Sequence, residues 1–420
     1  MERFIIQGGK QLAGEIKVNG AKNFALKILP AALLTDCEWK ISNVPQINDV
    51  LHSVELLKSI GVSIEKTSEK KYRIQAKNIS DNLDQNICVK IKTAVLMAGP
   101  MLARCGKITL SRAGGCSIGP RPHDIFWAGL KALGAEIKNK NDVCCLTAPR
   151  GLTGAKFVFP WVTVMGTEAM ILAGVLAKGK TVLKNTACEP EIPALADFLN
   201  RCGAKIKGAG TPFIEIEGVK SLRGGECRII PDRIEAGSFV LLGLATNSFI
   251  KITDLDINHL DALWASLEKV GADFELGKDY VQVKPNSKLL KAVELRTHEY
   301  PGFSTDLQSP FTVLMTQASG SSLIHETIFE KRLIYTDMLN EMGAKITMCD
   351  PHRVIVQGPT KLYGCRLLSP DIRAGIALVI AALTARGESV IQNICQIDRG
   401  YERLEERLVK LGADIRRVKD

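Results

Sequence analysis

One eight-residue pattern recurs six times along this chain of 420 residues and constrains its fold more than any other feature. The pattern is Leu-x-x-x-Gly-small-x-apolar, first seen over residues 57–64. Its six glycines lie 68 to 73 residues apart, at Gly61, Gly134, Gly203, Gly271, Gly343 and Gly412. Self-similarity at a fixed period indicates a repeat architecture, so each copy is interpreted as one structural unit.

Each copy carries the local signals of two helices and several strands. Apolar residues at three- and four-residue spacing predict helices, for example over 47–60 and 192–202. The glycine comes where such a helix ends and needs a left-handed residue, which only Gly adopts without steric cost. Alternating residues over 346–356, with a turn at Asp350-Pro351, predict paired strands. The repeat is therefore β-α-β-α-β-β, and at about 70 residues it is too small to bury both faces alone.

Six such repeats predict an α/β protein, and a chain of 420 residues fits two domains of three repeats each. Hydrophobic residues make up 46% and charged residues 24%, so a large globular core is available. No stretch of 18 apolar residues lacks a charge, and the most apolar one, 367–383, contains Asp371 and Arg373. No apolar signal-peptide core follows the first residues. A cytoplasmic enzyme is therefore expected.

Cysteine content and charge narrow the possible partners. The twelve cysteines include no Cys-x-x-Cys pair, so reduced thiols are expected rather than disulfides or a structural zinc site. The net charge of +10 is compatible with nucleic-acid binding. However, the basic residues are spread along the chain, and only 5% of residues are aromatic. Small anionic substrates are the favoured explanation.

A P-loop pattern, G-x-x-x-x-G-K-[ST], occurs at residues 174–181. That loop binds phosphate only when it follows a strand and precedes a helix. Here the expected order is reversed, with a helix over 168–176 before the pattern and a strand over 181–184 after it. The pattern is interpreted as a repeat turn.

The strongest candidate for chemistry is a loop over residues 114–122 that departs from the repeat. It holds three glycines and two prolines around Cys116, and Arg121 follows five residues later. A nearby cation lowers the pKa of a thiol, and arginine supplies a bidentate fork for oxyanions. An incidental exposed cysteine is the alternative.

Two further segments contain candidate polar groups. Lys22 and Asn23 follow a small-residue turn at the start of an apolar helix, where they suit an anion and a sugar hydroxyl. The alternative is that Asn23 only caps that helix. Asp306 follows a Pro-Gly turn in the segment 300–308 and enters a helical pattern. It is interpreted either as a helix-cap carboxylate or as a general base.

Three arginines in the second half complete the candidate set: Arg332, Arg373 and Arg399. Arg373 opens an otherwise apolar helix, which is a costly position unless the charge is paired or binds an anion. Each of the three lies near an acidic residue in the sequence, so structural ion pairing is the alternative for all of them.

Taken together, these phrases resemble the UDP-N-acetylglucosamine 1-carboxyvinyltransferases, a family of enolpyruvyl transferases. The resemblance runs from about residue 3 to residue 418. It is carried by Gly-Ala-Lys-Asn at 20–23, Gly-Gly-Cys-x-Ile-Gly-x-Arg-Pro at 114–122, Pro-Asp-Arg-Ile-Glu-Ala-Gly at 231–237, Tyr-Pro-Gly-Phe at 300–303, Asp-x-Arg-Ala at 371–374 and Ile-Asp-Arg-Gly-Tyr-Glu-Arg at 397–403.

The resemblance implies a fold and a reaction. The fold is a two-domain inside-out α/β barrel, with one domain over 21–230, the other formed by 1–20 and 231–420, and the active site in the cleft between them. The reaction moves the enolpyruvyl group of phosphoenolpyruvate to the 3-hydroxyl of UDP-N-acetylglucosamine and releases phosphate, through a tetrahedral ketal. It is the first committed step of peptidoglycan precursor synthesis for the cell wall. No metal or organic cofactor, nucleic acid or membrane partner is implied, and the oligomeric state is left open.

The resemblance also implies residue roles. Cys116 would be the general acid and the site of a phosphoenolpyruvate adduct, and therefore the target of the epoxide fosfomycin. Asp306 would accept the sugar hydroxyl proton, with Lys22 and Arg399 as further catalytic groups. Substrate-binding residues would be Lys22, Asn23, Lys92, Arg121, Pro122, His123, Asp124, Ile125, Thr163, Val164, Asp306, Ile328, Arg332, Arg373 and Arg399.

Departures from the family pattern concentrate on the nucleotide-sugar side. They are Lys92 for arginine, Met165 for glycine, Cys188 for arginine and Gln396 for histidine, together with Phe24, Lys27 and Pro30 in the first helix. One alternative is therefore a carboxyvinyl transferase with another nucleotide or nucleotide-sugar acceptor. A second is a non-catalytic UDP-sugar-binding paralogue, against which the retention of Cys116, Asp306 and Arg399 argues.

Overall fold

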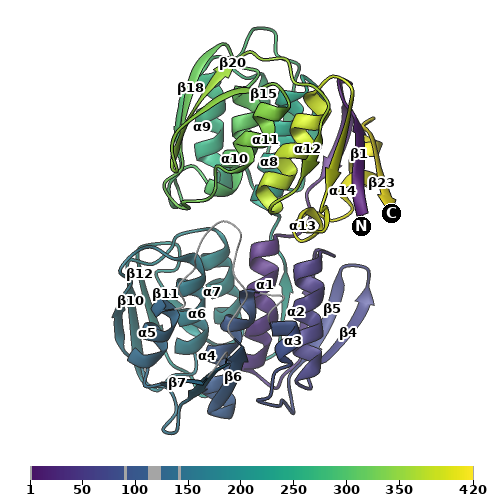
Figure 1. The fold of residues 1–420 in the computed structure, drawn as a ribbon. Coiled ribbons are helices and arrows are strands. Elements are labelled where there is room, and N and C mark those ends of the chain that lie inside the picture. Colours follow the sequence, from purple (N-terminus) through teal and green to yellow (C-terminus); the bar gives the residue numbers. More distant parts are fainter. Residues whose placement is uncertain (1, 89–91, 112–123, 141–142, 420) are drawn as a thin grey trace. The chain divides into compact units, whose positions relative to one another are not determined.

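The computed structural model describes residues 2–88, 92–111, 124–140 and 143–419 (Figure 1). These residues form two compact units. The continuous unit comprises the described residues of 20–230, and the split unit combines the strands before residue 20 with residues 231–419. Each unit has its own hydrophobic core.

The elements of the continuous unit are α1 (Lys22–Ala31), η1 (Ala32–Leu34), β3 (Trp39–Ser42), α2 (Asn48–Ser59), β4 (Ser63–Ser68), β5 (Lys71–Gln75), α3 (Gln85–Cys88), η2 (Lys92–Met97), α4 (Ala98–Cys105), β6 (Lys107–Ser111), α5 (Asp124–Ala132), β7 (Glu136–Lys140), β8 (Val143–Thr147), β9 (Lys156–Val158), α6 (Val164–Gly174), β10 (Lys180–Lys184), α7 (Glu191–Arg201), β11 (Lys205–Lys207), β12 (Phe213–Glu217) and β13 (Gly225–Arg228).

The elements of the split unit are β1 (Glu2–Gln7), β2 (Ala13–Lys17), α8 (Arg233–Ala245), β14 (Phe249–Thr253), η3 (Ile257–Leu260), α9 (Asp261–Val270), β15 (Phe274–Leu276), β16 (Tyr280–Val283), β17 (Glu294–Arg296), α10 (Thr305–Met315), β18 (Gly320–His325), α11 (Tyr335–Glu341), β19 (Lys345–Asp350), β20 (Arg353–Gly358), β21 (Arg366–Leu368), α12 (Ile372–Thr384), β22 (Glu388–Gln392), α13 (Cys395–Asp398), α14 (Leu404–Lys410) and β23 (Asp414–Lys419).

The predicted β-α-β-α-β-β repeat is confirmed by the sheet topology. In the sheet β17-β18-β20-β19, β17 and β18 are parallel and are joined through α10, whereas β19 and β20 form an antiparallel hairpin. Four other sheets have the same four-stranded plan. The sheet β6-β8-β7 has three strands, and an isolated bridge between Asn82 and Thr109 stands where a fourth strand would pair. That repeat is incomplete within the described ranges.

Three sheets are completed by strands that are distant in the sequence. In the continuous unit, β13 adds in parallel to β3, so the end of this unit completes its first sheet. In the split unit, β2 pairs in parallel with β14, and β1 lies between β22 and β23. The strands before residue 20 therefore belong to sheets whose other strands follow residue 231.

The most buried helices, such as α6 and α8, lie inside the sheets of their units, as the inside-out barrel predicted, whereas α2 and α9 expose one face to solvent. Every residue of α8 is buried, and α8, α10 and α12 pack against one another. The strands alternate instead, as in β12, where Ile214 and Ile216 are buried and Phe213 and Glu217 are exposed. One face of each sheet thus covers the helices, and the other faces solvent.

All six repeat glycines adopt a positive φ, between 76° and 105°, which confirms the left-handed helix ends predicted from the sequence. At Gly271, which ends α9 with a φ of 76°, a Cβ placed on the backbone would meet nothing within 4 Å. The backbone conformation, rather than crowding, therefore selects glycine there.

A second periodic feature had no counterpart in the sequence analysis. After the second strand of three repeats comes an asparagine with a φ of 57° to 58°. Its amide donates to the carbonyl that follows the parallel neighbouring strand: Asn43 to Ile229 at 2.9 Å, Asn185 to Phe159 at 3.0 Å and Asn393 to Ser369 at 2.8 Å. Each asparagine thus fastens the ends of two parallel strands together.

The P-loop interpretation is excluded as predicted, because α6 ends at Gly174, the first residue of the pattern, and β10 begins within the pattern at Lys180. Among the helices within the described ranges, none is long and apolar enough to cross a membrane.

Candidate active site

Several of the candidate residues share one position in the repeat, the N-terminus of an inner helix. In the continuous unit, Lys22 begins α1, Lys92 begins η2 ahead of α4, and Val164 begins α6. In the split unit, Asp306 and Arg373 are the second residues of α10 and α12. A helix N-terminus presents free N–H groups and the positive end of its dipole, so this position suits anionic ligands.

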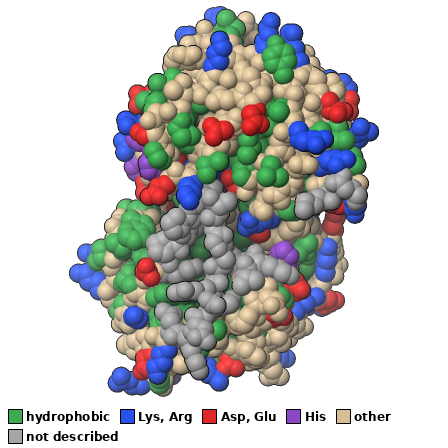
Figure 2. All heavy atoms as spheres, in the orientation of Figure 1, with side chains coloured by type: hydrophobic (Ala, Val, Ile, Leu, Met, Phe, Trp, Pro, Cys, Tyr) green, Lys and Arg blue, Asp and Glu red, His purple; other side chains and the backbone are tan. Residues whose placement is uncertain are grey.

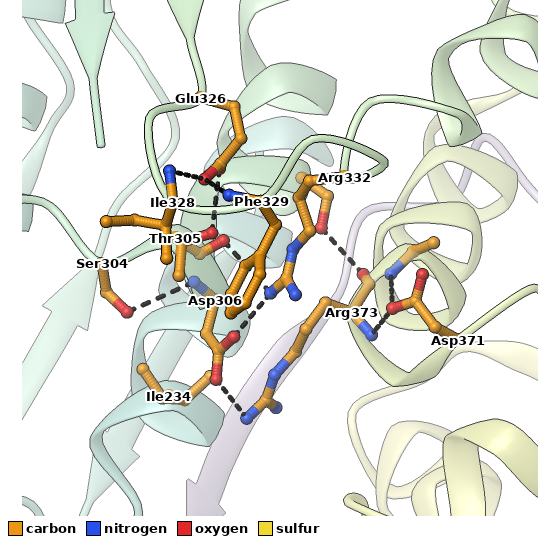
Figure 3. A network of polar contacts seen from close by, with 12 residues as sticks. Ile234, Ser304, Thr305, Asp306, Glu326, Ile328, Phe329, Arg332, Asp371 and Arg373 are labelled. Carbon is orange, nitrogen blue, oxygen red and sulfur yellow. Dashed lines mark hydrogen bonds and ion pairs between the residues drawn. The ribbon is translucent and has the colours of Figure 1, made fainter. Parts of the chain in front are cut away.

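Asp306 lies between two arginines (Figure 3). Arg332 Nη2 donates to its Oδ1 at 2.5 Å, and Arg373 Nη2 donates to its Oδ2 at 2.8 Å. The cap of α10 is Ser304, whose hydroxyl accepts from the Asp306 backbone N–H at 3.3 Å. The alternative in which Asp306 is the cap is therefore wrong, because its carboxylate serves the two guanidinium groups.

The two arginines control the protonation of Asp306. Burial alone would raise the pKa of this carboxyl, but Arg373 and Arg332 outweigh it and hold the pKa well below its usual range. Burial likewise acts to lower the pKa of Arg373, and Asp306 more than offsets that effect. Asp306 is consequently ionised but a weak base while both arginines hold it.

Arg332 has a buried hydrogen-bond donor that is not satisfied within the described residues. Its Nη2 also donates to the Thr305 carbonyl at 3.3 Å, and its guanidinium carbon lies 5.4 Å from the centre of the Phe329 ring. The side chain is only 3% exposed, and its buried Nε has no hydrogen-bond partner within the part of the chain that the structure describes. A buried unsatisfied donor on an arginine is a feature of sites that await an anion.

Arg373 also reaches a buried tyrosine. Its Nη1 lies 3.5 Å from the Tyr401 hydroxyl, which is in turn 2.9 Å from the Ser238 hydroxyl. Burial raises the pKa of Tyr401 to about 12, so this hydroxyl is neutral at physiological pH.

Sequence neighbours are not the carboxylate partners of Arg373 and Arg332. Asp371 caps α12, accepting from the backbone N–H of Arg373 at 2.8 Å and of Ala374 at 3.1 Å. The ion pairs of Arg373 and Arg332 run instead to Asp306. Both arginines are thus ion-paired, as that alternative proposed, but their partner is Asp306 and not the acidic residue nearest in the sequence.

Arg399 directly contacts one of the departures from the family pattern. Its Nη1 donates to Gln396 Oε1 at 3.0 Å. The neighbouring Asp398 binds Arg417, with Nη2 to Oδ1 at 2.7 Å. Gln396 therefore stands beside a candidate catalytic arginine and supplies it with a neutral acceptor.

Sequence reasoning missed Glu326, which is fully buried. Its Oε1 accepts from the backbone N–H of Ile328 at 2.8 Å and of Phe329 at 3.1 Å, and its Oε2 accepts from the Thr305 hydroxyl at 2.9 Å. Glu326 follows β18, where three other repeats have their asparagine. That departure from the repeat was the signal that could have identified it.

In the continuous unit, Lys22 is paired with a carboxylate. Its Nζ lies 2.7 Å from Asp49 Oδ2, and the two side chains are 9% and 10% exposed. The cap position of α1 is Ala21, without a side-chain hydrogen bond. The alternative in which Asn23 caps this helix is therefore wrong, and its side chain is half-buried.

A second buried pair ties α1 to α6. Lys27 Nζ lies 3.3 Å from Glu168 Oε2, with side chains 5% and 0% exposed. Burial raises the pKa of Glu168 to about 8, and Lys27 only partly opposes that rise because Glu191 and Glu189 reinforce it. Lys27, a departure from the family pattern, is thus a partner of a carboxyl that titrates near neutral pH.

The acceptor-side candidates of this unit lie at helix starts. Thr163 caps α6, its hydroxyl accepting from the Gly166 N–H at 3.2 Å, and Val164 is half-buried. Met165 is the next residue of that helix and packs partly against the core. Asp124 is exposed at the start of α5, and Ile125 beside it is buried.

Cys116, Arg121, Pro122 and His123 lie outside the described residues, as does the side chain of Lys92. Within the described ranges, no group of three or more His, Cys, Asp or Glu side chains is arranged to hold a metal ion. On the face shown in Figure 2, basic side chains are interspersed with acidic ones.

Comparison with known proteins gives a consistent set of relatives. Residues 6–408 match the family described as EPSP synthase (3-phosphoshikimate 1-carboxyvinyltransferase). UDP-N-acetylglucosamine 1-carboxyvinyltransferases from Trichlorobacter lovleyi and Saccharophagus degradans are 43% and 41% identical, each over 100% of both chains.

Solved structures agree in fold. The enolpyruvyl transferase NikO from Streptomyces tendae superposes with a TM-score of 0.91 at 25% identity, over 100% of this chain and 99% of that one. EPSP synthase from Acinetobacter baumannii superposes with a TM-score of 0.78 at 18% identity over the whole of both chains, which shows the fold alone.

Proposed function

Because this chain belongs to the EPSP synthase family of carboxyvinyl transferases, we propose that it transfers the enolpyruvyl group of phosphoenolpyruvate to the 3-hydroxyl of UDP-N-acetylglucosamine and releases phosphate. This is the first committed step of peptidoglycan precursor synthesis. Full-length relatives at 41% to 43% identity carry the name of that activity, and no relative among them is named for another acceptor.

The single observation that best supports this chemistry is the carboxylate of Asp306 between two buried arginines. The acceptor hydroxyl must lose a proton as it attacks C2 of phosphoenolpyruvate, while the methylene carbon gains one and becomes a methyl group. Phosphate then leaves the tetrahedral ketal as that methyl group is deprotonated. The reaction therefore needs a base, an acid and cations for two anionic substrates.

The arginines also give Asp306 a way to become a stronger base. In the structure, Arg332 and Arg373 hold its pKa low. An anionic substrate competes for the same guanidinium groups, and the unsatisfied Nε of Arg332 is a donor open to it. When the arginines turn to the phosphate or carboxylate of phosphoenolpyruvate, Asp306 loses its counter-charges and its pKa rises. Binding of the donor would thus prepare Asp306 to accept the hydroxyl proton.

The remaining roles in the proposal rest on the family resemblance. Cys116 is the general acid towards the methylene carbon, and Lys22, Arg121 and Arg399 hold the donor. The acceptor contacts are assigned to Asn23, Lys92, Pro122, His123, Asp124, Ile125, Thr163, Val164 and Ile328. A cytoplasmic location remains a prediction, which fractionation of cells with an antibody to the chain would test.

The competing proposal is transfer to a different nucleotide-sugar acceptor. The reason to consider it is the set of departures from the family pattern at Lys92, Met165, Cys188 and Gln396. Gln396 has a direct contact, with Arg399, but that residue is assigned to the donor. The names of the full-length relatives favour UDP-N-acetylglucosamine.

The deciding experiment measures phosphate release from phosphoenolpyruvate with UDP-N-acetylglucosamine, for the wild type and Cys116→Ala, with the product mass checked. Turnover that yields the enolpyruvyl ether and is lost or much reduced in the variant supports the proposal. Absence of turnover, while phosphoenolpyruvate still protects Cys116 from alkylation by fosfomycin, would show that the donor site works and the acceptor differs.

A further inference from the structure

Glu326 occupies an exceptional position in the repeat. In three repeats the residue after the second strand is an asparagine whose side chain fastens two parallel strands. After β18 the residue is Glu326, which is 0% exposed and does not adopt the positive φ of those asparagines. Its carboxyl group binds other partners, so this repeat has a buried carboxyl group where three others have the asparagine contact between strands.

Those partners belong to the two segments that carry the Asp306–Arg332 pair. One carboxylate oxygen binds the Thr305 hydroxyl, at the start of α10 beside Asp306. The other binds the N–H groups of Ile328 and Phe329, in the loop that leads to Arg332. Figure 3 shows the hydrogen bonds that join the Glu326 carboxylate to both segments. Both carboxylate oxygens of Glu326 therefore have partners.

The backbone of Glu326 is fixed as well. Its N–H donates to the His352 carbonyl at 2.7 Å, and its own carbonyl lies 2.8 Å from His352 Nδ1. The carboxylate is therefore a rigid anchor rather than a flexible side chain. Arg332 in turn contacts both Thr305 and Asp306. Glu326 and the Asp306–Arg332 ion pair therefore connect the same two segments, the start of α10 and the loop that leads to Arg332.

We propose that Glu326 is a positioning residue that holds the Arg332 guanidinium against Asp306 by clamping the start of α10 to the loop before Arg332. This inference rests on the proposed function, because it assigns the anion-binding and base roles to Arg332 and Asp306. Glu326 acts through its hydrogen bonds, since its two carboxyl oxygens bind a hydroxyl and two backbone N–H groups.

A pair of substitutions separates hydrogen bonding from charge. In Glu326→Gln, the amide oxygen can still accept from the two backbone N–H groups, and the amide nitrogen can donate to the Thr305 hydroxyl. In Glu326→Ala, both connections are lost. The Gln variant is therefore expected to behave like the wild type, and the Ala variant to lose the geometry of Arg332. Thr305→Val, which removes only the hydroxyl contact, is expected to fall between them.

The first readout does not depend on activity. Arg332 and Arg373 are modified with phenylglyoxal, and the labelling rate of each is measured by peptide mass spectrometry. In Glu326→Ala, the ratio of Arg332 to Arg373 labelling should rise at least five-fold, because the Arg373 side chain is held by Asp306 and Tyr401 instead. Glu326→Gln should leave that ratio unchanged. A general loss of stability would instead raise both rates together.

The second readout is steady-state kinetics. Glu326→Ala should raise KM for phosphoenolpyruvate about ten-fold, equivalent to about 1.4 kcal/mol, and move the acid limb of the kcat/KM profile to higher pH. Glu405→Ala is the control, because Glu405 is a 14%-exposed carboxylate of the same unit that bonds Arg417. It should leave the kinetics unchanged.

An unchanged labelling ratio in Glu326→Ala, or a Gln variant as impaired as the Ala variant, would overturn the inference. If the wild type lacked turnover with UDP-N-acetylglucosamine, the proposed function would fail, whereas the labelling ratio would still decide whether Glu326 positions Arg332. The two failures are therefore distinguishable.

Discussion

Asp306 and Arg373 join the N-termini of two inner helices, α10 and α12, through an ion pair of 2.8 Å across 67 residues of sequence. The two residues hold equivalent places in successive repeats, each the second residue of its helix. A carboxylate at one start and a guanidinium at the next give a charge pair that neither repeat could form alone. The repeat therefore places two equivalent helix starts side by side, and the residues at those starts can carry opposite charges without any change in the helices.

Replacement of Asp306 by asparagine should lower kcat by roughly 10² to 10⁴, the usual contribution of a general base. Asparagine keeps the shape but has one acceptor oxygen for two arginines, so one guanidinium loses its hydrogen bond and the proton acceptor is lost. Phosphate release under saturating substrates measures the effect. A variant that kept kcat within ten-fold of the wild type would remove Asp306 from the catalytic step.

Replacement of Arg373 by lysine should weaken donor binding more than acceptor binding. Lysine retains the charge but not the planar fork that reaches Asp306 and the Tyr401 hydroxyl at once. KM for phosphoenolpyruvate should rise about ten-fold, or about 1.4 kcal/mol. If KM for UDP-N-acetylglucosamine rose and that for phosphoenolpyruvate did not, Arg373 would belong to the acceptor site.

The Lys27–Glu168 pair predicts a stability that declines with pH. The pKa of Glu168 is about 8 in the folded protein, against 4.5 for an ordinary glutamate in water, which represents the unfolded chain. The folded form binds this proton more tightly, so the contribution of Glu168 to stability is fully present below pH 4.5 and is lost as pH rises to about 8. The loss is at most about 5 kcal/mol.

Glu168→Gln removes that titration and should flatten the dependence of Tm on pH between 5 and 9, because a neutral amide needs no proton to remain buried. Lys27→Met should steepen it, since Glu168 then loses the cation that opposes the effect of burial on its pKa. Differential scanning fluorimetry across this range provides the measurement. Parallel curves for the wild type and Glu168→Gln would contradict the assignment.

Gly271→Ala should cost about 1 kcal/mol, from the left-handed conformation alone, because the space beside Gly271 is open. Asparagine tolerates that conformation better and should cost less. Gly99→Ala is the contrast, since its Cβ would lie 2.8 Å from the Cα of Ala173, between α4 and α6. Urea unfolding compares them, and equal losses for Ala and Asn at Gly271 would disprove the conformational explanation.

Sequence periodicity was sufficient to predict the repeat because the repeat uses local chemistry, whereas the inside-out barrel was implied by the family resemblance. A helix over 48–59, a hairpin over 345–358 and a left-handed Gly343 each follow from residues within a few positions of one another. The shortened sheet β6-β8-β7 was not foreseen, because the residues before α4 carry no strand pattern whose loss could be noticed. Whether a sheet has its fourth strand depends on parallel pairing between segments on either side of an inner helix, which a local pattern does not reveal.

The candidate site was predicted as a set of residues but not as a set of contacts. Arg373 has Asp371 two residues before it, yet Asp371 caps the helix and the guanidinium reaches Asp306. Local sequence could not choose between these, because a carboxylate serves backbone N–H groups and guanidinium groups equally well. Glu326 was overlooked for a related reason, since its role depends on Thr305, which lies 21 residues earlier.

The pairing of the first described strand, β1, with the last strands affects the order in which the protein folds during synthesis. β1 lies between β22 and β23, and about 400 residues separate it from the latter. At a synthesis rate of 5 to 20 residues per second, β1 waits roughly 20 to 80 s on the ribosome for its partners. The continuous unit can fold within that interval, since β13 closes its first sheet as soon as residue 228 has emerged. The first of the described strands to leave the exit tunnel is thus among the last to find its place.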